Sequence, residues 1–524
     1  MKLQRCAGVL LHPTSFPGSY GIGDLSNRDF IDFLYKAKQK LWQVLPLGPT
    51  GFGDSPYQSF SSFAGNTLLL SPKMLHGRGY LSLRDVEPPY FSSKFIDYGK
   101  VYIYKKALHK KAYENFKKST FGKTEYRSFV KENAHWLEDY ALFTALKEFF
   151  MIQRKKEGKT KEYEAYRKKN FKYMTESEID DCYFGALWTS WPKDTADRES
   201  AAISRWRKEL EDKIDLEKFL QYEFYRQWDL LKIYANTKGI QIIGDIPIFV
   251  AYDSADTWAD KELFFLDKTG NPTKVAGVPP DYFSEEGQLW GNPLYNWKIH
   301  KETGFKWWIS RVEAVLKLVD IVRIDHFRGF ESYWAVKFGK KTAIDGKWEK
   351  GIGKDLFIEM KKQIGDLPII AEDLGIITPP VEKLRDDLEL PGMKILQFAF
   401  GDDNENAYLP HNLTTTNCVI YTGTHDNNTS VGWYNTASEK EKDYLRRYLN
   451  VSGEDIAWDM IRLAYSSTAA FALVPLQDLL SQDSHFRMNT PGQAADNWQY
   501  RYQQGKLTDG IAEGLEYLVE LFNR

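Results

Sequence analysis

The sequence predicts an α/β fold, a (β/α)8 barrel (TIM barrel) with inserted, mainly helical subdomains and no C-terminal β-domain. Eight short apolar runs each end in a polar residue near Gly, Pro or Asp, as buried parallel strands do. Charged amphipathic segments lie between most of these runs, which is the alternation of a barrel. A doubly wound open sheet is the alternative architecture.

The predicted strands follow one another at residues 8–12, 41–46, 241–245, 319–325, 367–372, 393–398, 418–425 and 471–475. Amphipathic helices are predicted between most of them, at residues 29–40, 307–318, 355–364, 381–388 and 439–448. After the eighth strand the chain shows no run of short alternating strands and ends in a helical pattern at 510–522.

Two intervals between strands are too long for simple crossovers. We expect residues 1–524 to form one catalytic barrel unit with residues 48–238 inserted as a helical subdomain between the second and third strands. Residues 250–300 are expected to form a substrate-loop region between the third and fourth strands. Its segment 275–297 is rich in Gly, Pro and aromatic residues, and long loops of this kind usually carry function.

Composition narrows the class of partner. The chain has 70 Lys plus Arg and 72 Asp plus Glu, a net charge of −2, so we expect neither nucleic acid nor membrane as partner. Three widely spaced cysteines and the lack of a long apolar run indicate a reducing, cytoplasmic location. The 15% aromatic share fits either a bulky core or flat binding faces for sugar rings.

Charged residues gather at the carboxyl ends of four predicted strands, which meet at the catalytic rim of a barrel. These residues are Asp245 on the third strand, Arg323, Asp325 and His326 on the fourth, Glu372 on the fifth, and His425 and Asp426 on the seventh. Any one carboxylate could be a helix cap, but four at one rim indicate chemistry. Arg323 lies two residues before Asp325 on the same side of its strand and can hold that carboxylate ionised.

Metal hydrolysis and glycoside chemistry both use such a cluster. The nine histidines include no His-x-His pair, and no phosphate-binding glycine motif follows a strand. We therefore expect glycoside chemistry with no metal and no cofactor.

Three segments, 322–329, 371–375 and 424–427, resemble the catalytic regions of the α-amylase clan. The match is closer to the 4-α-glucanotransferases, called amylomaltases or disproportionating enzymes, which further segments at 18–25, 54–65, 244–252, 275–295 and 487–492 also resemble. The resemblance implies that Asp325 is the nucleophile, Glu372 the general acid/base and Asp426 the third, sugar-stabilising carboxylate. The third strand lacks the clan's usual Asn-His pair, which is in keeping with the glucanotransferase branch.

The implied substrate-binding residues come from the rim and from the loops above it. They are Tyr57, Asp245, Asp281, Gln288, Trp290, Arg323, His326, His425 and Asn489. Turn formation beside Pro491 explains Asn489 nearly as well.

The resulting hypothesis is a retaining 4-α-glucanotransferase. It would move a segment of an α-1,4-glucan to the 4-OH of glucose or a maltooligosaccharide through a covalent glucosyl-enzyme. The expected partners are maltooligosaccharides and glucans derived from starch or glycogen, in a bacterial cytosol or a plastid stroma. The alternatives are an α-1,4-glucan hydrolase and a catalytically inactive glucan-binding barrel.

Overall fold

The computed structural model describes residues 3–170, 175–280, 284–401, 403–493 and 495–524. Its centre is a parallel sheet of eight strands: β1 (Cys6–Leu10), β2 (Leu41–Gln43), β3 (Gln241–Pro247), β6 (Ile321–Asp325), β9 (Ile369–Ala371), β10 (Gly392–Ile395), β11 (Cys418–Tyr421) and β12 (Phe471–Pro475). These strands coincide with the eight apolar runs of the sequence, and their order is β10-β11-β12-β1-β2-β3-β6-β9.

The sheet closes on itself. The backbone N–H of Ala371 in β9 donates to the carbonyl of Pro391, just before β10, at 2.9 Å. The predicted (β/α)8 barrel is therefore confirmed. Inside it a compact apolar cluster is formed by inward-facing residues of several strands, among them Leu41, Ile243, Ile321, Ile370, Tyr421 and Leu473.

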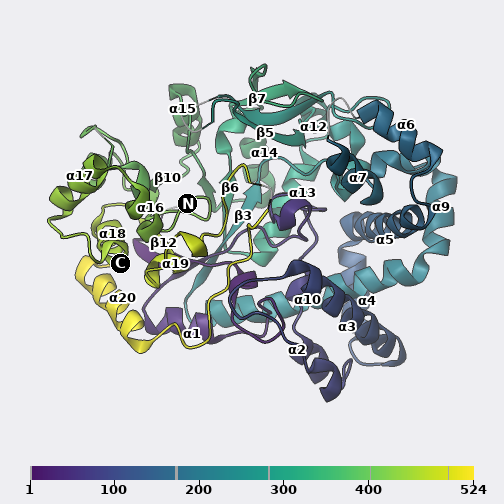
Figure 1. The fold of residues 1–524 in the computed structure, drawn as a ribbon, viewed down its shortest axis with the longest axis horizontal. Coiled ribbons are helices and arrows are strands. Elements are labelled where there is room, and N and C mark those ends of the chain that lie inside the picture. Colours follow the sequence, from purple (N-terminus) through teal and green to yellow (C-terminus); the bar gives the residue numbers. More distant parts are fainter. Residues whose placement is uncertain (1–2, 171–174, 281–283, 402, 494) are drawn as a thin grey trace.

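Helices cover the outside of the barrel (Figure 1). They include α1 (Asp29–Lys36), α13 (Lys306–Leu318), α14 (Asp355–Ile364), α15 (Pro379–Asp387), α16 (Ser430–Thr436), α17 (Glu439–Leu449), α18 (Ile456–Ser466) and α20 (Asp509–Phe522). No helix within the described ranges is both long and apolar enough to cross a lipid bilayer.

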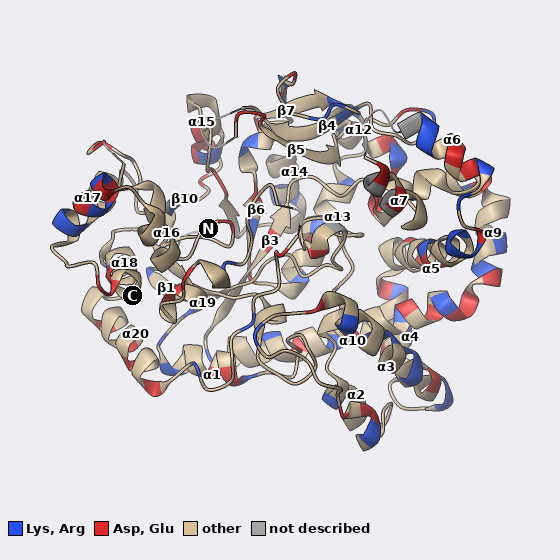
Figure 2. Cartoon of the chain, viewed as in Figure 1, with Lys and Arg blue, Asp and Glu red and all other residues tan. Residues whose placement is uncertain are grey.

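The interval between β2 and β3 is largely helical within the described residues. It holds α2 (Pro72–Gly77), α3 (Tyr98–Lys118), α4 (Lys123–Glu132), α5 (Ala134–Glu157), α6 (Lys161–Asn170), α7 (Glu176–Phe184), α8 (Lys193–Ala196), α9 (Ser200–Glu209) and α10 (Glu211–Thr237). Lys, Arg, Asp and Glu alternate along the outer faces of these helices, which indicates solvated surfaces (Figure 2). Many of the inner faces share a second apolar cluster that includes Trp136, Trp191 and Trp206.

A small antiparallel sheet lies above the barrel, at the top of Figure 1. Two of its strands, β4 and β5, fall in the segment around 275–297, where the sequence predicted only a loop. Its strands are β4 (Lys274–Val278), β5 (Gln288–Pro293), β7 (Ser332–Lys337) and β8 (Lys347–Lys350), in the order β5-β4-β7-β8. Trp334 and Trp348 face each other across β7 and β8 with ring centroids 5.2 Å apart. Cross-strand aromatic pairs of this kind stabilise such a sheet.

After β12 the described residues form short helical segments and α20, with no named strand among them. Residues 487–493 and 495–502 run back over the barrel, where Arg501 donates to the carbonyl of Gly18 at 2.7 Å. The carboxyl ends of β3, β6, β9 and β11 lie below this segment and carry the predicted site residues.

Candidate active site

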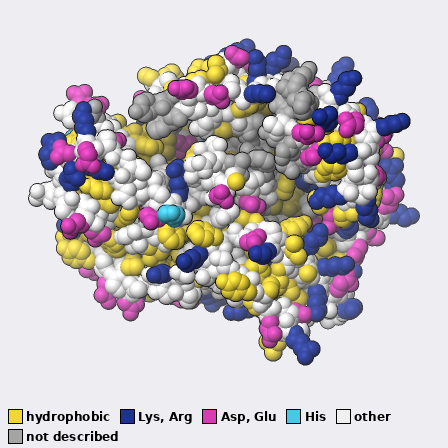
Figure 3. Space-filling view, in the orientation of Figure 1, with side chains coloured by type: hydrophobic (Ala, Val, Ile, Leu, Met, Phe, Trp, Pro, Cys, Tyr) yellow, Lys and Arg dark blue, Asp and Glu magenta, His cyan; other side chains and the backbone are white. Residues whose placement is uncertain are grey.

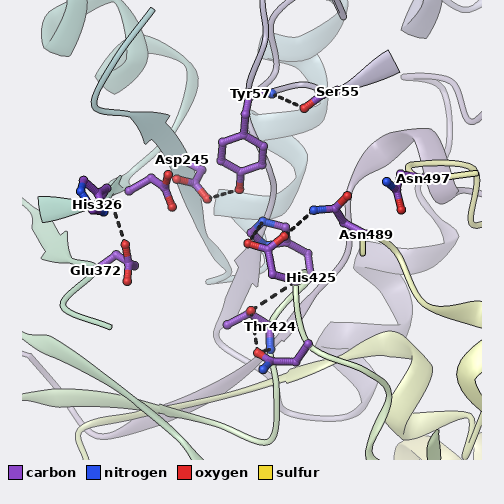
Figure 4. A network of polar contacts seen from close by, with 12 residues as sticks. Ser55, Tyr57, Asp245, His326, Glu372, Thr424, His425, Asn489 and Asn497 are labelled. Carbon is purple, nitrogen blue, oxygen red and sulfur yellow. Dashed lines mark hydrogen bonds and ion pairs between the residues drawn. The ribbon is translucent and has the colours of Figure 1, made fainter. Parts of the chain in front are cut away.

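Four carboxylates converge at the carboxyl rim of the barrel. Asp325 ends β6, Glu372 follows β9, Asp426 follows β11, and Asp245 lies near the end of β3. Figure 4 shows side chains from these strand ends turned toward a common centre. The face above them is hollowed near its middle, with acidic side chains at its border (Figure 3).

Arg323 lies between two of these carboxylates. Its Nη1 donates to Asp245 Oδ2 at 2.6 Å and its Nη2 to Asp325 Oδ1 at 2.9 Å. The register of β3 and β6 pairs Asp245 with Arg323, and strand alternation brings Asp325 to the same face. The Arg323 side chain is only 4% exposed, so both ion pairs are held largely away from water.

Burial raises the pKa of the Asp325 carboxyl, Arg323 opposes that rise, and the neighbouring Glu372 carboxylate adds to it. The sequence argument expected Arg323 to keep Asp325 ionised. The geometry of that pair is as expected, but burial and the crowding of carboxylates act more strongly on the pKa.

Glu372 is fixed by two backbone amides. Its Oε2 accepts from the N–H of His326 at 2.6 Å and its Oε1 from the N–H of Leu374 at 2.8 Å. Because His326 directly follows Asp325, this bond places the Glu372 carboxyl beside the Asp325 segment. Burial raises the pKa of Glu372, with Arg323 and the two amides opposing it. His326 itself has a left-handed backbone (φ 52°), a strained conformation that is common at functional sites.

Asp426 is held from a different part of the chain. Asn489 Nδ2 donates to its Oδ1 at 2.6 Å, and its Oδ2 lies 3.3 Å from His425 Nε2. The Asn489 backbone N–H also donates to the carbonyl of His425 at 3.1 Å. The structure thus brings Asn489 to the site. Arg487, which the sequence did not single out, supports this arrangement by donating to the carbonyls of Asp426 and Asn489.

One wall of the site is aromatic. The rings of Tyr57 and His425 stack with centroids 5.1 Å apart and planes 12° apart, and the Tyr57 hydroxyl donates to Asp245 Oδ2 at 2.8 Å. Burial lowers the pKa of His425, so this imidazole is neutral near pH 7. The ring of Trp498 packs against both Tyr57 and His425, and no pattern in the sequence had indicated it.

The small antiparallel sheet supplies a second aromatic contact at the rim. The Trp290 indole on β5 donates to Gln288 Oε1 at 3.1 Å. The Trp290 ring meets the ring of His326 edge to face, with centroids 4.8 Å apart and an interplanar angle of 83°. Of the predicted substrate-binding residues, only Asp281 lies outside the described residues.

Three buried polar atoms in the described part of this site have no hydrogen-bond partner: Asp245 Oδ1, His326 Nε2 and His425 Nδ1. Buried polar atoms almost always find partners, so each of these calls for a ligand group or water. Sugar hydroxyls both donate and accept and can satisfy all three. The site therefore suits a neutral polyhydroxylated ligand next to paired carboxylates.

Comparison with known proteins gives one consistent family. The family model described as 4-alpha-glucanotransferase matches residues 11–508. The 4-alpha-glucanotransferase of Synechocystis sp. is 47% identical over 530 residues, which cover 99% of this chain and 98% of that protein. The 4-alpha-glucanotransferase of Thermus thermophilus is 45% identical and the match covers 100% of both chains.

The solved structures agree with the sequence relatives. The structure of amylomaltase from Streptococcus agalactiae in complex with acarbose is similar with a TM-score of 0.91 and 39% identity. That match covers 99% of this chain and 100% of the other.

Proposed function

The chain belongs to the 4-alpha-glucanotransferase family, and we propose that Asp325, Glu372 and Asp426 carry out its reaction. The protein is a glycosyltransferase that acts on α-1,4-glucans. The observation that carries our assignment of roles is the hydrogen bond from the His326 amide to Glu372, which sets the two reacting carboxylates side by side.

In the first step an Asp325 oxygen attacks the anomeric carbon of a donor glucan. The bond from that carbon to the leaving oxygen breaks, and the leaving oxygen takes the proton of Glu372. This double displacement needs carboxyl groups about 5–5.5 Å apart. The raised pKa of buried Glu372 favours the protonated form that this step uses.

In the second step the 4-OH of an acceptor sugar attacks the same carbon. Glu372 takes the hydroxyl proton, the ester bond to Asp325 breaks, and both carboxyl groups return to their starting states. Asp426, held by Asn489 and His425, would bind sugar hydroxyls more strongly in the distorted state, which lowers the barrier.

The acceptor must compete with water, and two aromatic contacts support the binding of a sugar. Tyr57 and Trp290 are each packed against a histidine of the rim. Held in place, an acceptor hydroxyl gains a large effective concentration over free water. We place maltooligosaccharides and starch- or glycogen-derived glucans as donors and acceptors, in a cytosolic or stromal compartment.

Both insertions contribute residues to the proposed site. We propose that residues 48–238 form a helical subdomain and that the chain is otherwise one barrel unit. The helical subdomain contributes Tyr57. Residues 250–300, the proposed substrate region, contribute Gln288 and Trp290 on β5.

The activity is tested by incubating the protein with maltotriose alone and separating products by size. Transfer yields glucose together with maltopentaose and longer chains. Glucose and maltose with nothing longer would make the protein a hydrolase. The absence of any product would support the alternative of a catalytically inactive glucan-binding barrel.

The nucleophile is tested by Asp325→Asn, which we expect to lower kcat by about 10³-fold or more, since an amide cannot form the ester. Asp345→Asn is the matched control, because Asp345 is an exposed aspartate of the β7–β8 hairpin. Near-normal transfer by Asp325→Asn would remove Asp325 from the mechanism.

A further inference from the structure

Trp498 is buried at the site but has no part in the steps above. It lies in the segment that returns over the rim after β12, and its side chain and backbone are together 6% exposed. Its ring centroid is 5.8 Å from that of Tyr57 and 5.9 Å from that of His425. Since Tyr57 and His425 also stack on each other, the three rings form one closed group, here called the ring triad.

Each of the other two rings is tied to a carboxylate of the rim. The Tyr57 hydroxyl donates to Asp245, and His425 Nε2 lies 3.3 Å from Asp426 Oδ2. A shift of either ring therefore moves a polar contact next to the reacting sugar. Trp498 is the member of the triad with no such contact of its own among the described residues.

The backbone at Trp498 is strained and firmly held. Its φ is 64°, and that of Asp496 is 62°, a left-handed region that a bulky side chain rarely adopts. The Trp498 N–H donates to the carbonyl of Met488 at 2.8 Å, and its carbonyl accepts from the Tyr98 hydroxyl at 2.9 Å. Such strain persists only where the surroundings fix it, and it gathers at functional sites.

The neighbouring residue Asn497 fixes the turn that leads to Trp498. Its Oδ1 accepts from the N–H of Thr490 and its Nδ2 donates to the carbonyl of Gln493, both at 2.8 Å. Figure 4 shows Asn497 on the same side of the site as Asn489. One short segment thus delivers both Asn489 to Asp426 and Trp498 to the ring triad.

We propose that Trp498 is a positioning residue of the transfer reaction: it holds Tyr57 and His425, and through them Asp245 and Asp426, where the transition state needs them. This inference rests on the proposed function. A Trp that only filled space would affect stability and leave turnover per folded molecule unchanged. A positioning residue affects kcat, because small displacements at a reacting centre are costly.

The test compares Trp498→Ala and Trp498→Phe with Trp206→Ala. Trp206 is a matched control: it is 7% exposed, packs against Phe149 and Phe150, and lies on α9 of the insertion. We measure the thermal midpoint, kcat and KM for maltotriose, and the Kd of acarbose by calorimetry. Both alanine variants should lower the thermal midpoint.

Only Trp498→Ala should lower kcat, by about 10- to 100-fold, with KM changed far less. Its Kd for acarbose should rise about tenfold. The kcat and Kd of Trp498→Phe should lie between those of Trp498→Ala and wild type, because a phenyl ring is smaller than an indole and larger than a methyl group. Wild-type kcat and acarbose affinity in Trp498→Ala would overturn the inference. If the alanine variant does not fold, wild-type values in Trp498→Phe overturn it equally.

Product formation by the wild type and the Kd of acarbose in the variants test the proposed function and this inference separately. A wild-type protein that gives no longer products from maltotriose would defeat the proposed function alone. The acarbose Kd compares the variants without any turnover, so an unchanged Kd in Trp498→Ala would then still count against the positioning role.

Discussion

At the scale of single residues, Arg323 controls the charge balance of the rim. It pairs with Asp245, whose side chain is fully buried, and with Asp325, whose side chain is partly exposed. Burial and Glu372 raise the pKa of Asp325, and Arg323 is the group that opposes them most strongly. The ionised fraction of Asp325, the proposed nucleophile, at a given pH therefore depends on this cation.

Arg323→Gln should move the acidic limb of the pH profile upward. In the proposed mechanism Asp325 must be ionised to attack, so kcat/KM should fall as the pH drops through its pKa. Removing the guanidinium raises that pKa further, and the loss of activity then begins at a higher pH. The profile of kcat/KM against pH with maltotriose measures the effect.

Arg198→Gln is the control for this prediction, because Arg198 pairs with Asp139 in the insertion, away from the rim. Its acidic limb should coincide with that of wild type. An acidic limb of Arg323→Gln that stays in place, or moves to lower pH, would contradict the role given to Arg323.

Strand ends predicted the candidate site residues of the rim, and the family resemblance added Tyr57, Trp290 and Asn489, but both missed Arg487 and Trp498. Asp325, Glu372 and Asp426 could be found because a barrel collects strand ends at one rim. Arg487 and Trp498 could not, since their contacts join the end of the chain to distant segments and leave no spacing or periodicity. Asn489 was ambiguous for the same reason, because a turn before proline explains it locally.

At the scale of elements, parallel strands were predictable and the antiparallel sheet was not. Buried parallel strands are continuous apolar runs with turn residues after them, and all eight were found. The sheet of β4, β5, β7 and β8 combines strands from both sides of β6, so neither segment shows the pairing alone. Gly277 lies where β4 approaches β5, and such glycines favoured a loop interpretation.

The closure of β9 against β10 predicts an effect of Gly392→Ala. A Cβ at Gly392 would lie 2.4 Å from Asp373 Oδ2, and Asp373 accepts from the Met393 N–H at 2.7 Å. The variant should displace Asp373 and, with it, the adjoining Glu372. We expect a loss of about 1–3 kcal/mol in the free energy of unfolding and a kcat lowered about tenfold.

Urea unfolding and maltotriose kinetics measure both effects. Gly77→Ala is the control, since a Cβ added at Gly77 in α2 would meet no described atom within 4 Å outside its own helix turn. It should leave kcat unchanged and stability equal or slightly higher. An unchanged kcat in Gly392→Ala would mean that Glu372 is positioned independently of Asp373.

At the scale of the whole molecule, the candidate active site and the anchor formed by Arg524 lie at opposite ends of the strands. The rim carries the carboxylates, while Arg524 lies at the amino ends of β1 and β12. Its guanidinium donates to carbonyl groups of Cys6, Ala464, Tyr465, Ser467, Ala469 and Ala470. It thereby joins the segment after α20 to the last turn of α18 and to two neighbouring strands.

Arg524→Met should therefore destabilise the protein without changing the chemistry. Burial lowers the pKa of Arg524 to about 10, so it is cationic at pH 7 and bonds these carbonyls as a charge. The loss of these hydrogen bonds from a charged donor should lower the free energy of unfolding by about 2–4 kcal/mol, with Arg5 still donating to the carbonyls of Tyr465 and Ala469. The urea midpoint should fall, while kcat for maltotriose at 25 °C stays within about twofold of wild type because the rim keeps its contacts.

Lys506→Met, which removes an exposed cation shortly before α20, should leave both quantities unchanged. A wild-type urea midpoint would show that the Arg524 contacts add nothing to stability, and a large fall in kcat would show that the two ends of the barrel are coupled.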